Sequence, residues 1–272
     1  CKPLHTNFQD PEYDPAYVPD RQYRVMVGVM SIFSSVEQRA ILRETWIDRM
    51  YKMLEGKNVT VDVRFFLGQQ PTATTQVYSE VMAEQEKFGD LVFGNFVEST
   101  KTLWEKFVNM LHITGAGDYD YFIKVDDDTY MRMDVLIDEL LHRGPSTTPI
   151  YRGYMLTWSY VRRNPAAKWY QPFAEFGEPV YPPYASGPCY VLSQSIVRTL
   201  SYAHRHHMLQ RIEIDDAAVG VYLRSTPTRF EDDSRFPHFH DRCTSDKLGV
   251  HCSSRARFLE YHRNLVETGS MC

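Results

Sequence analysis

Three consecutive carboxylates, Asp126, Asp127 and Asp128, follow an apolar run that predicts a buried strand over residues 121–125. Side chains alternate along an extended backbone, so Asp126 and Asp128 point to one side and Asp127 to the other. Two convergent carboxylates need a cation to offset their repulsion, and hard oxygen ligands favour Mg²⁺ or Mn²⁺. Two protein oxygens leave most of an octahedral shell open, which suits a diphosphate. A solvated acidic turn is the alternative interpretation, and both stay open at this point.

A second acidic group, Glu213, Asp215 and Asp216, stands where the apolar pattern of residues 217–223 predicts the start of a helix. Carboxylates at that position stabilise the helix dipole, so simple N-terminal capping is one interpretation. The other is that Asp216 acts as a general base at the mouth of a site.

Histidines near the end of the chain offer nitrogen ligands for a metal. His238 and His240 lie in the stretch "FPHFHD", and His251 lies in "GVHCSS". Each of them could equally be a structural or exposed histidine.

The elements that must position these residues alternate between strands and helices. The predicted strands cover residues 23–30, 59–68, 91–93 and 121–125, and the predicted helices cover residues 35–54, 75–88 and 100–114. The first helix is expected to begin with a capping box formed by Ser34 and Glu37. This alternation predicts an α/β domain with a mostly parallel central sheet. Ligands bind at the carboxyl ends of strands in such sheets, which is where the acidic triplet should lie.

The segment 144–188 is too long and too rich in Pro, Tyr and Trp for a simple linker. Long ordered insertions in compact domains are usually functional, so we expect short strands and a groove wall there. Residues 1–22 predict an irregular lead-in, and residues 23–272 a single domain.

Composition excludes some functions and leaves others open. The net charge is −5 with acids and bases interspersed, so no basic stripe indicates nucleic-acid binding. No apolar run reaches the roughly 18 residues that span a bilayer. The chain begins at Cys1, so an upstream membrane anchor could have been removed.

Five cysteines and one glycosylation sequon, at Asn58, favour a secretory compartment. Cys243 and Cys252 are close enough in sequence to close a small loop. No cysteine spacing matches a zinc site. The odd cysteine permits a disulfide-linked homodimer.

Several of these segments together resemble one family. The stretch "RAILRETW" (39–46) resembles the R-x-x-I-R-x-T-W signature of β-1,3-galactosyl- and N-acetylglucosaminyltransferases, glycosyltransferase family 31. In chain order, further stretches are similar to motifs of that family: "RFFLG" (64–68), "EKFGDLVFGNFVESTKTLWEK" (86–106), "KVDDDTY" (124–130), "YPPYASGPCYVLS" (181–193), "IDDAAVG" (214–220) and "VHCSSRARFLEYHRNL" (250–265).

The resemblance implies a GT-A fold, with a nucleotide-sugar half over about residues 23–130 and an acceptor half over about 131–272. It implies a Golgi membrane protein with a lumenal catalytic domain and an inverting transferase that uses a UDP-sugar and Mn²⁺ (or Mg²⁺). Carried over by position, the metal ligands would be Asp128 and His251, with His238 and His240 as rivals to His251. The expected catalytic base is Asp216. The residues expected to bind the nucleotide sugar are Arg39, Arg43, Lys101, Asp126 and Asp127.

The sequence departs from the family pattern in places. Asp215 stands where the family has Glu, and Cys189 where it has Gly. Galactose is the first expectation for the donor sugar and N-acetylglucosamine the second, transferred to a glycan hydroxyl in a β-1,3 linkage. A carbohydrate-binding descendant without turnover is the alternative. The acceptor wall is expected to use aromatic residues of the long insertion and the next strand, because flat sugar faces stack on rings: Trp158, Tyr160, Trp169, Tyr170 and Tyr184.

Overall fold

The computed structural model describes residues 21–143, 148–239, 242–252 and 254–272. Nearly all of the expected lead-in, residues 1–20, therefore lies outside the described residues. None of the helices in the described part combines the length and apolar character needed to cross a bilayer.

A seven-stranded sheet in the order β10-β6-β9-β4-β1-β2-β3 forms the centre of the molecule. All its neighbouring pairs are parallel except those made by β9, which runs antiparallel to β4 and β6. The predicted α/β class with a mostly parallel sheet is therefore confirmed. The strands are β1 (Tyr23–Met30), β2 (Val59–Gln69), β3 (Leu91–Val97), β4 (Tyr121–Asp126), β6 (Ile150–Leu156), β9 (Tyr184–Ser193) and β10 (Arg229–Asp232).

Two short antiparallel ribbons stand outside this sheet. One pairs β5 (Thr129–Met131) with β11 (Gly249–His251), and the other pairs β7 (Ser159–Tyr160) with β8 (Val180–Tyr181). The second lies in the long aromatic insertion, where short strands were expected.

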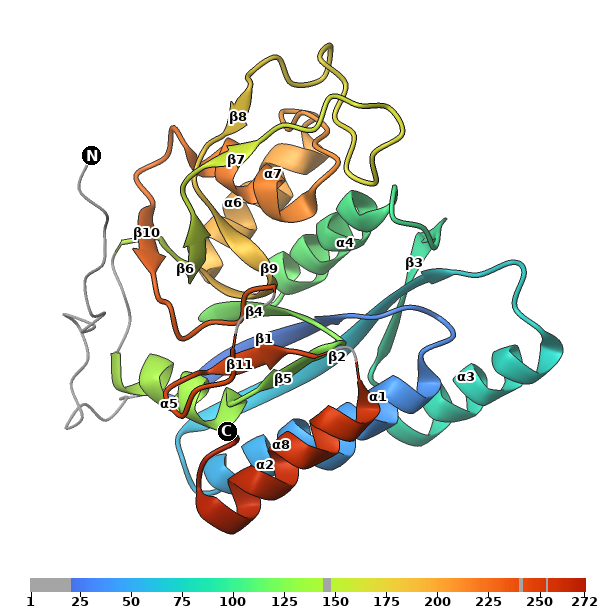
Figure 1. The fold of residues 1–272 in the computed structure, drawn as a ribbon, viewed down its shortest axis with the longest axis vertical. Coiled ribbons are helices and arrows are strands. Elements are labelled where there is room, and N and C mark those ends of the chain that lie inside the picture. Colours follow the sequence, from blue (N-terminus) through green and yellow to red (C-terminus); the bar gives the residue numbers. More distant parts are fainter. Residues whose placement is uncertain (1–20, 144–147, 240–241, 253) are drawn as a thin grey trace.

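Helices cover both faces of the sheet (Figure 1). Successive side chains of β1 explain why both faces are apolar: Val25, Val27 and Val29 enter one buried cluster, and Met26 enters the other. Figure 1 places α1, α2 and α8 below the sheet and α4, α6 and α7 above it. The helices are α1 (Val36–Leu42), the π-helical turn η1 (Arg43–Ile47), α2 (Asp48–Leu54), α3 (Thr75–Phe88), α4 (Leu103–Ala116), α5 (Met133–Arg143), α6 (Gln194–Arg205), α7 (Asp215–Leu223) and α8 (Arg255–Thr268).

The predicted capping box is wrong. The first helix begins at Val36 with Ser35 at the N-cap position, and no side chain there accepts a capping hydrogen bond. Glu37 instead faces solvent and lies 3.5 Å from Arg255 at the start of α8. The expected long helix is present, but a π-helical turn interrupts it.

The predicted pairing of Cys243 with Cys252 is also wrong. Cys243 is bonded to Cys272, with Cα atoms 5.6 Å apart, and so joins the C-terminus to the segment before β11. Cys252 is buried and its thiol donates to the carbonyl of Ser254 at 3.4 Å. Cys189 is buried too, so neither free cysteine of the described part is placed to link two chains.

We expect Cys272→Ser to lower the free energy of unfolding by about 3 to 4 kcal/mol, the entropy that a disulfide closing a loop of this length removes from the unfolded chain. The sequence separation between the two cysteines is 29 residues. Denaturant unfolding under non-reducing conditions measures the change. Reduced wild type should match the variant. An unchanged midpoint in both would show that the bond does not stabilise the fold.

A histidine pair joins α4 to α6. His112 Nε2 lies 3.1 Å from His204 Nδ1, and His112 Nδ1 lies 2.9 Å from the Ser201 hydroxyl. Burial lowers the pKa of both imidazoles; the neighbouring charges of His204 and Arg205 lower that of His112 further. The fold therefore holds both rings neutral.

Because the folded-state pKa of His112 lies below its unfolded value near 6.5, its contribution is present above pH 6.5 and lost as pH falls further. We expect the stability advantage of wild type over His112→Gln to shrink between pH 7.5 and pH 5. Thermal unfolding of the two proteins across that range measures it. A constant difference would contradict the neutral pair.

Candidate active site

The acidic triplet lies at the carboxyl end of β4, next to the ends of its neighbours in the sheet. The Asp127 amide donates to the Met30 carbonyl at the end of β1, at 3.1 Å. The Cys252 amide, directly after β11, donates to the Asp128 carbonyl at 2.7 Å. Backbone bonds from two elements therefore fix the triplet where the crevice of an α/β sheet is expected.

A buried lysine joins the two acidic groups. Lys124 is 2% exposed, and its Nζ lies 2.7 Å from Asp126 and 3.5 Å from Asp216. It also donates to the carbonyl of Gly187 at 2.6 Å. Burial alone would lower the pKa of Lys124, but the charges of Asp126 and Asp216 raise it above its usual range. The structure thus brings Asp216 beside the triplet, although 90 residues separate them in the chain.

Asp216 is held in a tight space at the start of α7. A Cβ on Gly187 would come within 2.3 Å of Asp216 Oδ2, so only glycine lets β9 approach the carboxylate this closely. Burial raises the pKa of Asp216 well above its usual range, the charge of Asp215 raises it further, and Lys124 opposes both. A raised pKa suits a group that must accept a proton near neutral pH.

Asp127 has a different partner from the other two carboxylates. Its Oδ2 accepts from the Ser31 hydroxyl at 2.7 Å, and Arg39 donates to the same hydroxyl at 3.3 Å. Burial raises the pKa of Asp127 to about 6, although the Ser31 hydrogen bond lowers it. Arg39 is fully buried and makes a two-bond ion pair with Glu84. Arg39 therefore reaches the triplet only through Ser31.

The other two cations predicted for the nucleotide lie elsewhere. Arg43 pairs with Glu84 and Asp90 and packs over the rings of Phe65 and Phe88. Lys101 is exposed just before α4, and its carbonyl accepts a hydrogen bond from Arg211.

Sequence analysis did not single out Lys106, which lies beside Ser31, directly after β1. It is 2% exposed and donates to the Ser31 carbonyl at 2.5 Å and to Glu98 at 2.6 Å. A signal was available, because Lys106 falls on the same apolar stripe of α4 as Leu103, Phe107 and Met110. A lysine on a buried stripe implies a partner inside the molecule.

Asp128 and His251 face each other across the β5–β11 ribbon. His251 Nε2 lies 3.1 Å from Asp128 Oδ2, and this carboxylate raises the pKa of the imidazole. The second oxygen of Asp128 is buried and has no hydrogen-bond partner in the described structure. One carboxylate oxygen without a partner beside one imidazole fits a divalent cation.

His238, one of the two rivals to His251, has other partners. His238 Nδ1 lies 2.8 Å from the Ser186 hydroxyl, and its ring stacks on Tyr154 with centroids 4.6 Å apart. His240 lies outside the described residues. Within the described part, no group of three or more His, Cys, Asp or Glu residues forms a metal cage. The Asp128–His251 pair would therefore leave most of a metal's coordination shell open to a ligand.

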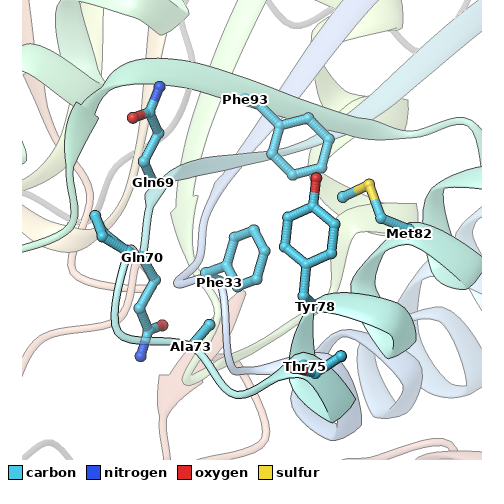
Figure 2. A pocket seen from close by; sticks show the side chains of 9 residues that line it. Phe33, Gln69, Gln70, Ala73, Thr75, Tyr78, Met82 and Phe93 are labelled. Carbon is cyan, nitrogen blue, oxygen red and sulfur yellow. The ribbon is translucent and has the colours of Figure 1, made fainter.

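A cavity of about 730 Å³ opens at the carboxyl ends of β1 and β2. Figure 2 shows three aromatic rings around it, from Phe33, Tyr78 and Phe93. Phe33 and Tyr78 stack with centroids 6.1 Å apart. The loop that carries Phe33 also carries Ser31, the hydrogen-bond partner of Asp127. The same short loop thus contributes to the cavity wall through Phe33 and contacts the triplet through Ser31.

The aromatic residues predicted for an acceptor wall divide by exposure. Trp158 and Tyr160 are each 69% exposed. Trp169 and Tyr170 are partly buried, and Tyr184 is buried at the start of β9. Trp158 and Tyr160 alone of the five present most of their ring surface to solvent.

The sequence matches a family model and several known proteins. The family model described as Galactosyltransferase matches residues 37–232. The chain is 26% identical over 95% of its length to the β-1,3-galactosyltransferase GALT1 of Arabidopsis thaliana, and covers 40% of that protein. It is 28% identical over 87% of its length to the hydroxyproline O-galactosyltransferase GALT5 of the same plant, covering 34%. The mouse β-1,3-galactosyltransferase 1 is 26% identical over 79% of the chain, which covers 64% of that enzyme.

The chain therefore spans about two fifths of the length of the plant relatives. Among solved structures it is similar to a mannosyltransferase from Pyrobaculum calidifontis in complex with GDP-Man and Mn²⁺. That likeness has a TM-score of 0.44 and 13% identity, over 92% of this chain and 65% of the other. A likeness of this degree says nothing of the ligand bound here. The family match over more than two thirds of the sequence shows that the chain belongs to the galactosyltransferase family of glycosyltransferases.

Proposed function

We propose that this protein transfers galactose from UDP-galactose to a sugar hydroxyl, with inversion at the anomeric carbon and formation of a β-1,3 linkage. The observation that carries the proposal is the Lys124 bridge, which holds Asp126 and Asp216 beside each other. In this proposal Asp126 would bind the donor and Asp216 would accept the proton, and the bridge supports it by keeping the two carboxylates close together. The names of the relatives support galactose as the sugar.

A divalent cation, Mn²⁺ or Mg²⁺, would be held by Asp128 and His251. When bound, it would offset the negative charge of the diphosphate leaving group. The unpartnered Asp128 oxygen supports this assignment. Asp126 and Asp127 would hold the nucleotide sugar on either side of the strand end.

The chain's own residues supply the proton chemistry. Asp216 would take the proton from the acceptor hydroxyl as its oxygen attacks the anomeric carbon from the face opposite the nucleotide. Lys124 holds Asp216 in position and, by its charge, keeps a fraction of it ionised despite burial. One displacement turns an α-linked donor into a β-linked product, and no covalent intermediate is needed.

The nucleoside would lie in the aromatic cavity. Its rings offer flat apolar faces to a base, and Gln70 Oε1, on the cavity wall, is buried without a hydrogen-bond partner in the described structure. An acceptor oxygen there suits the N–H edge of uracil. One short loop connects the cavity with the triplet, because it carries both Phe33, which lines the cavity, and Ser31, which donates to Asp127.

We expect Tyr78→Ala to raise the KM for the UDP-sugar about 3- to 10-fold with kcat little changed, because a stacked aromatic ring is worth about 0.5–1.5 kcal/mol. Tyr78 is 56% exposed at the cavity rim. Tyr202→Ala is the matched control, since Tyr202 is 57% exposed on α6, which packs on the other face of the sheet. An unchanged KM in Tyr78→Ala would place the nucleoside elsewhere.

The product tests the reaction itself. Proton NMR of the isolated disaccharide should show the β configuration and attachment at position 3. An α product, or transfer from a different UDP-sugar alone, would contradict the proposal.

We further propose that the protein works in the lumen of the Golgi apparatus, anchored by a segment outside this sequence. The Cys243–Cys272 disulfide supports an oxidising compartment, and Asn58 of the sequon is exposed.

A further inference from the structure

The β7 strand presents two aromatic rings to solvent. Trp158 and Tyr160 are each 69% exposed, and their ring centroids lie 5.9 Å apart with planes at 87°. Large aromatic side chains are usually mostly buried, so two adjacent exposed rings call for an explanation. The two rings are nearly perpendicular and form an exposed corner, so a ligand can contact the face of one ring and the edge of the other.

This corner is tied to the elements that carry Asp216. Ser159, between the two rings, shares a hydrogen bond with the Tyr184 hydroxyl at 2.9 Å. Tyr184 begins β9, three residues before Gly187, the glycine packed against Asp216. A Cβ on Gly220 of α7 would meet Tyr184 Cβ at 2.8 Å, so the helix of Asp216 packs directly on this tyrosine.

The effect of Asp216 on the pKa of Tyr184 agrees with the short distance between the two elements. Burial raises the pKa of Tyr184, the Ser159 hydrogen bond lowers it, and the charge of Asp216 raises it again. Figure 1 shows β7 and β8 on the same side of the sheet as α7, away from α2 and α8. The strand that carries Tyr160 therefore lies on the same side of the sheet as the helix that carries Asp216.

We propose that Trp158 and Tyr160 form the platform on which a pyranose ring of the acceptor stacks. This inference rests on the proposed function and makes it more specific, because it names the residues that would hold the acceptor sugar. The C–H face of a pyranose packs on a flat ring, and the nearby Ser159 and Tyr160 hydroxyls can bond its hydroxyls. A proline-rich peptide instead docks in an extended aromatic groove, which a two-ring corner does not provide.

The kinetic test compares Trp158→Ala, Tyr160→Ala and Trp158→Phe. The donor is UDP-galactose with Mn²⁺, and the acceptor probes are benzyl β-galactopyranoside and benzyl N-acetyl-β-glucosaminide. We expect each alanine variant to raise the acceptor KM about 5- to 10-fold, the effect of about 1 to 1.4 kcal/mol. Trp158→Phe should recover most of the loss. Tyr51→Ala is the control, since Tyr51 is 47% exposed on α2 at the opposite face and should leave the acceptor KM unchanged.

A binding test reports on the same ring without turnover. Of the four tryptophans, Trp46 and Trp104 are buried and Trp169 is partly buried, so Trp158 dominates the solvent-exposed fluorescence. With UDP and Mn²⁺ present, the pyranoside probes should shift the emission of wild type to the blue. Trp158→Phe should lose this shift.

Acceptor-independent hydrolysis of UDP-galactose distinguishes a failure of the acceptor platform from a failure of the proposed function. If hydrolysis is unchanged in Trp158→Ala while the acceptor KM rises, the platform is supported. If the alanine variants keep the wild-type acceptor KM, or a hydroxyproline-rich peptide shifts the Trp158 emission and the pyranosides do not, the platform is wrong while the proposed function stands. If wild type neither binds UDP nor hydrolyses the donor, the proposed function fails and the platform fails with it.

Discussion

Asp216→Asn should lose between about 10²- and 10⁴-fold of its turnover, the range that a positioned general base contributes. The amide has nearly the same shape but cannot take the acceptor's proton. Asp216 lies against Gly187 with no room for a larger group, so the isosteric change preserves packing. Steady-state transfer with UDP-galactose measures the loss. Binding of UDP with Mn²⁺, followed by calorimetry, should stay within a few-fold of wild type.

The control is Glu213→Gln, three residues before Asp216. Glu213 pairs with Arg211 on the surface at 3.1 Å, and neutralising it should leave turnover within a few-fold of wild type. Wild-type turnover in Asp216→Asn would assign the base to another residue. Loss of UDP binding together with turnover would make Asp216 a donor-binding residue.

Lys124→Met should destabilise the fold by about 3 to 5 kcal/mol, because removing one partner of a buried ion pair leaves the other charge without compensation. Lys124 is 2% exposed and has two carboxylates and a carbonyl as partners. For a chain of this size, such a loss lowers the melting temperature by roughly 6 to 20 °C. Turnover should fall too, since Asp126 and Asp216 then repel each other.

The loss of stability in Lys124→Met should depend on pH. Without the lysine, Asp126 and Asp216 relieve their repulsion by taking up protons, so the stability gap between wild type and variant should narrow from pH 8 to pH 5. Lys52→Met is the control, because its pair with Asp48 is exposed and such pairs contribute less than about 1 kcal/mol. A Lys124→Met protein as stable as Lys52→Met would show that the bridge is not a structural requirement.

The pattern of apolar residues was sufficient to predict the strands β1 to β4 of the sheet. The run Tyr23–Met30 is apolar throughout because helices cover both faces of β1, and β2 to β4 follow with the expected helices between them. Two expectations from short sequence patterns, the capping box and the cysteine pairing, were wrong. Ser34 and Glu37 form no capping box because the helix begins one residue later than the pattern requires, with Ser35 at the N-cap position. Cys243 bonds the final residue of the chain, not the cysteine nine positions away.

The sequence predicted which motif side chains lie close together, but not the residues that hold them in place. Asp126, Asp216 and the Asp128–His251 pair come together as the resemblance implied. The bridging Lys124 was not singled out, since only the fold shows that residues 124 and 216 are neighbours. Lys106 was not singled out either, although its position on the apolar stripe of α4 predicts that it is buried.

The central claim is that this site binds a UDP-sugar through a metal held by Asp128. The most direct measurement is UDP release from a panel of UDP-sugars, with and without Mn²⁺, by wild type and by Asp128→Ala. We expect release from UDP-galactose that requires Mn²⁺ and falls at least about 100-fold in the variant. Equal release by both proteins, or none from any UDP-sugar with and without the metal, would contradict it.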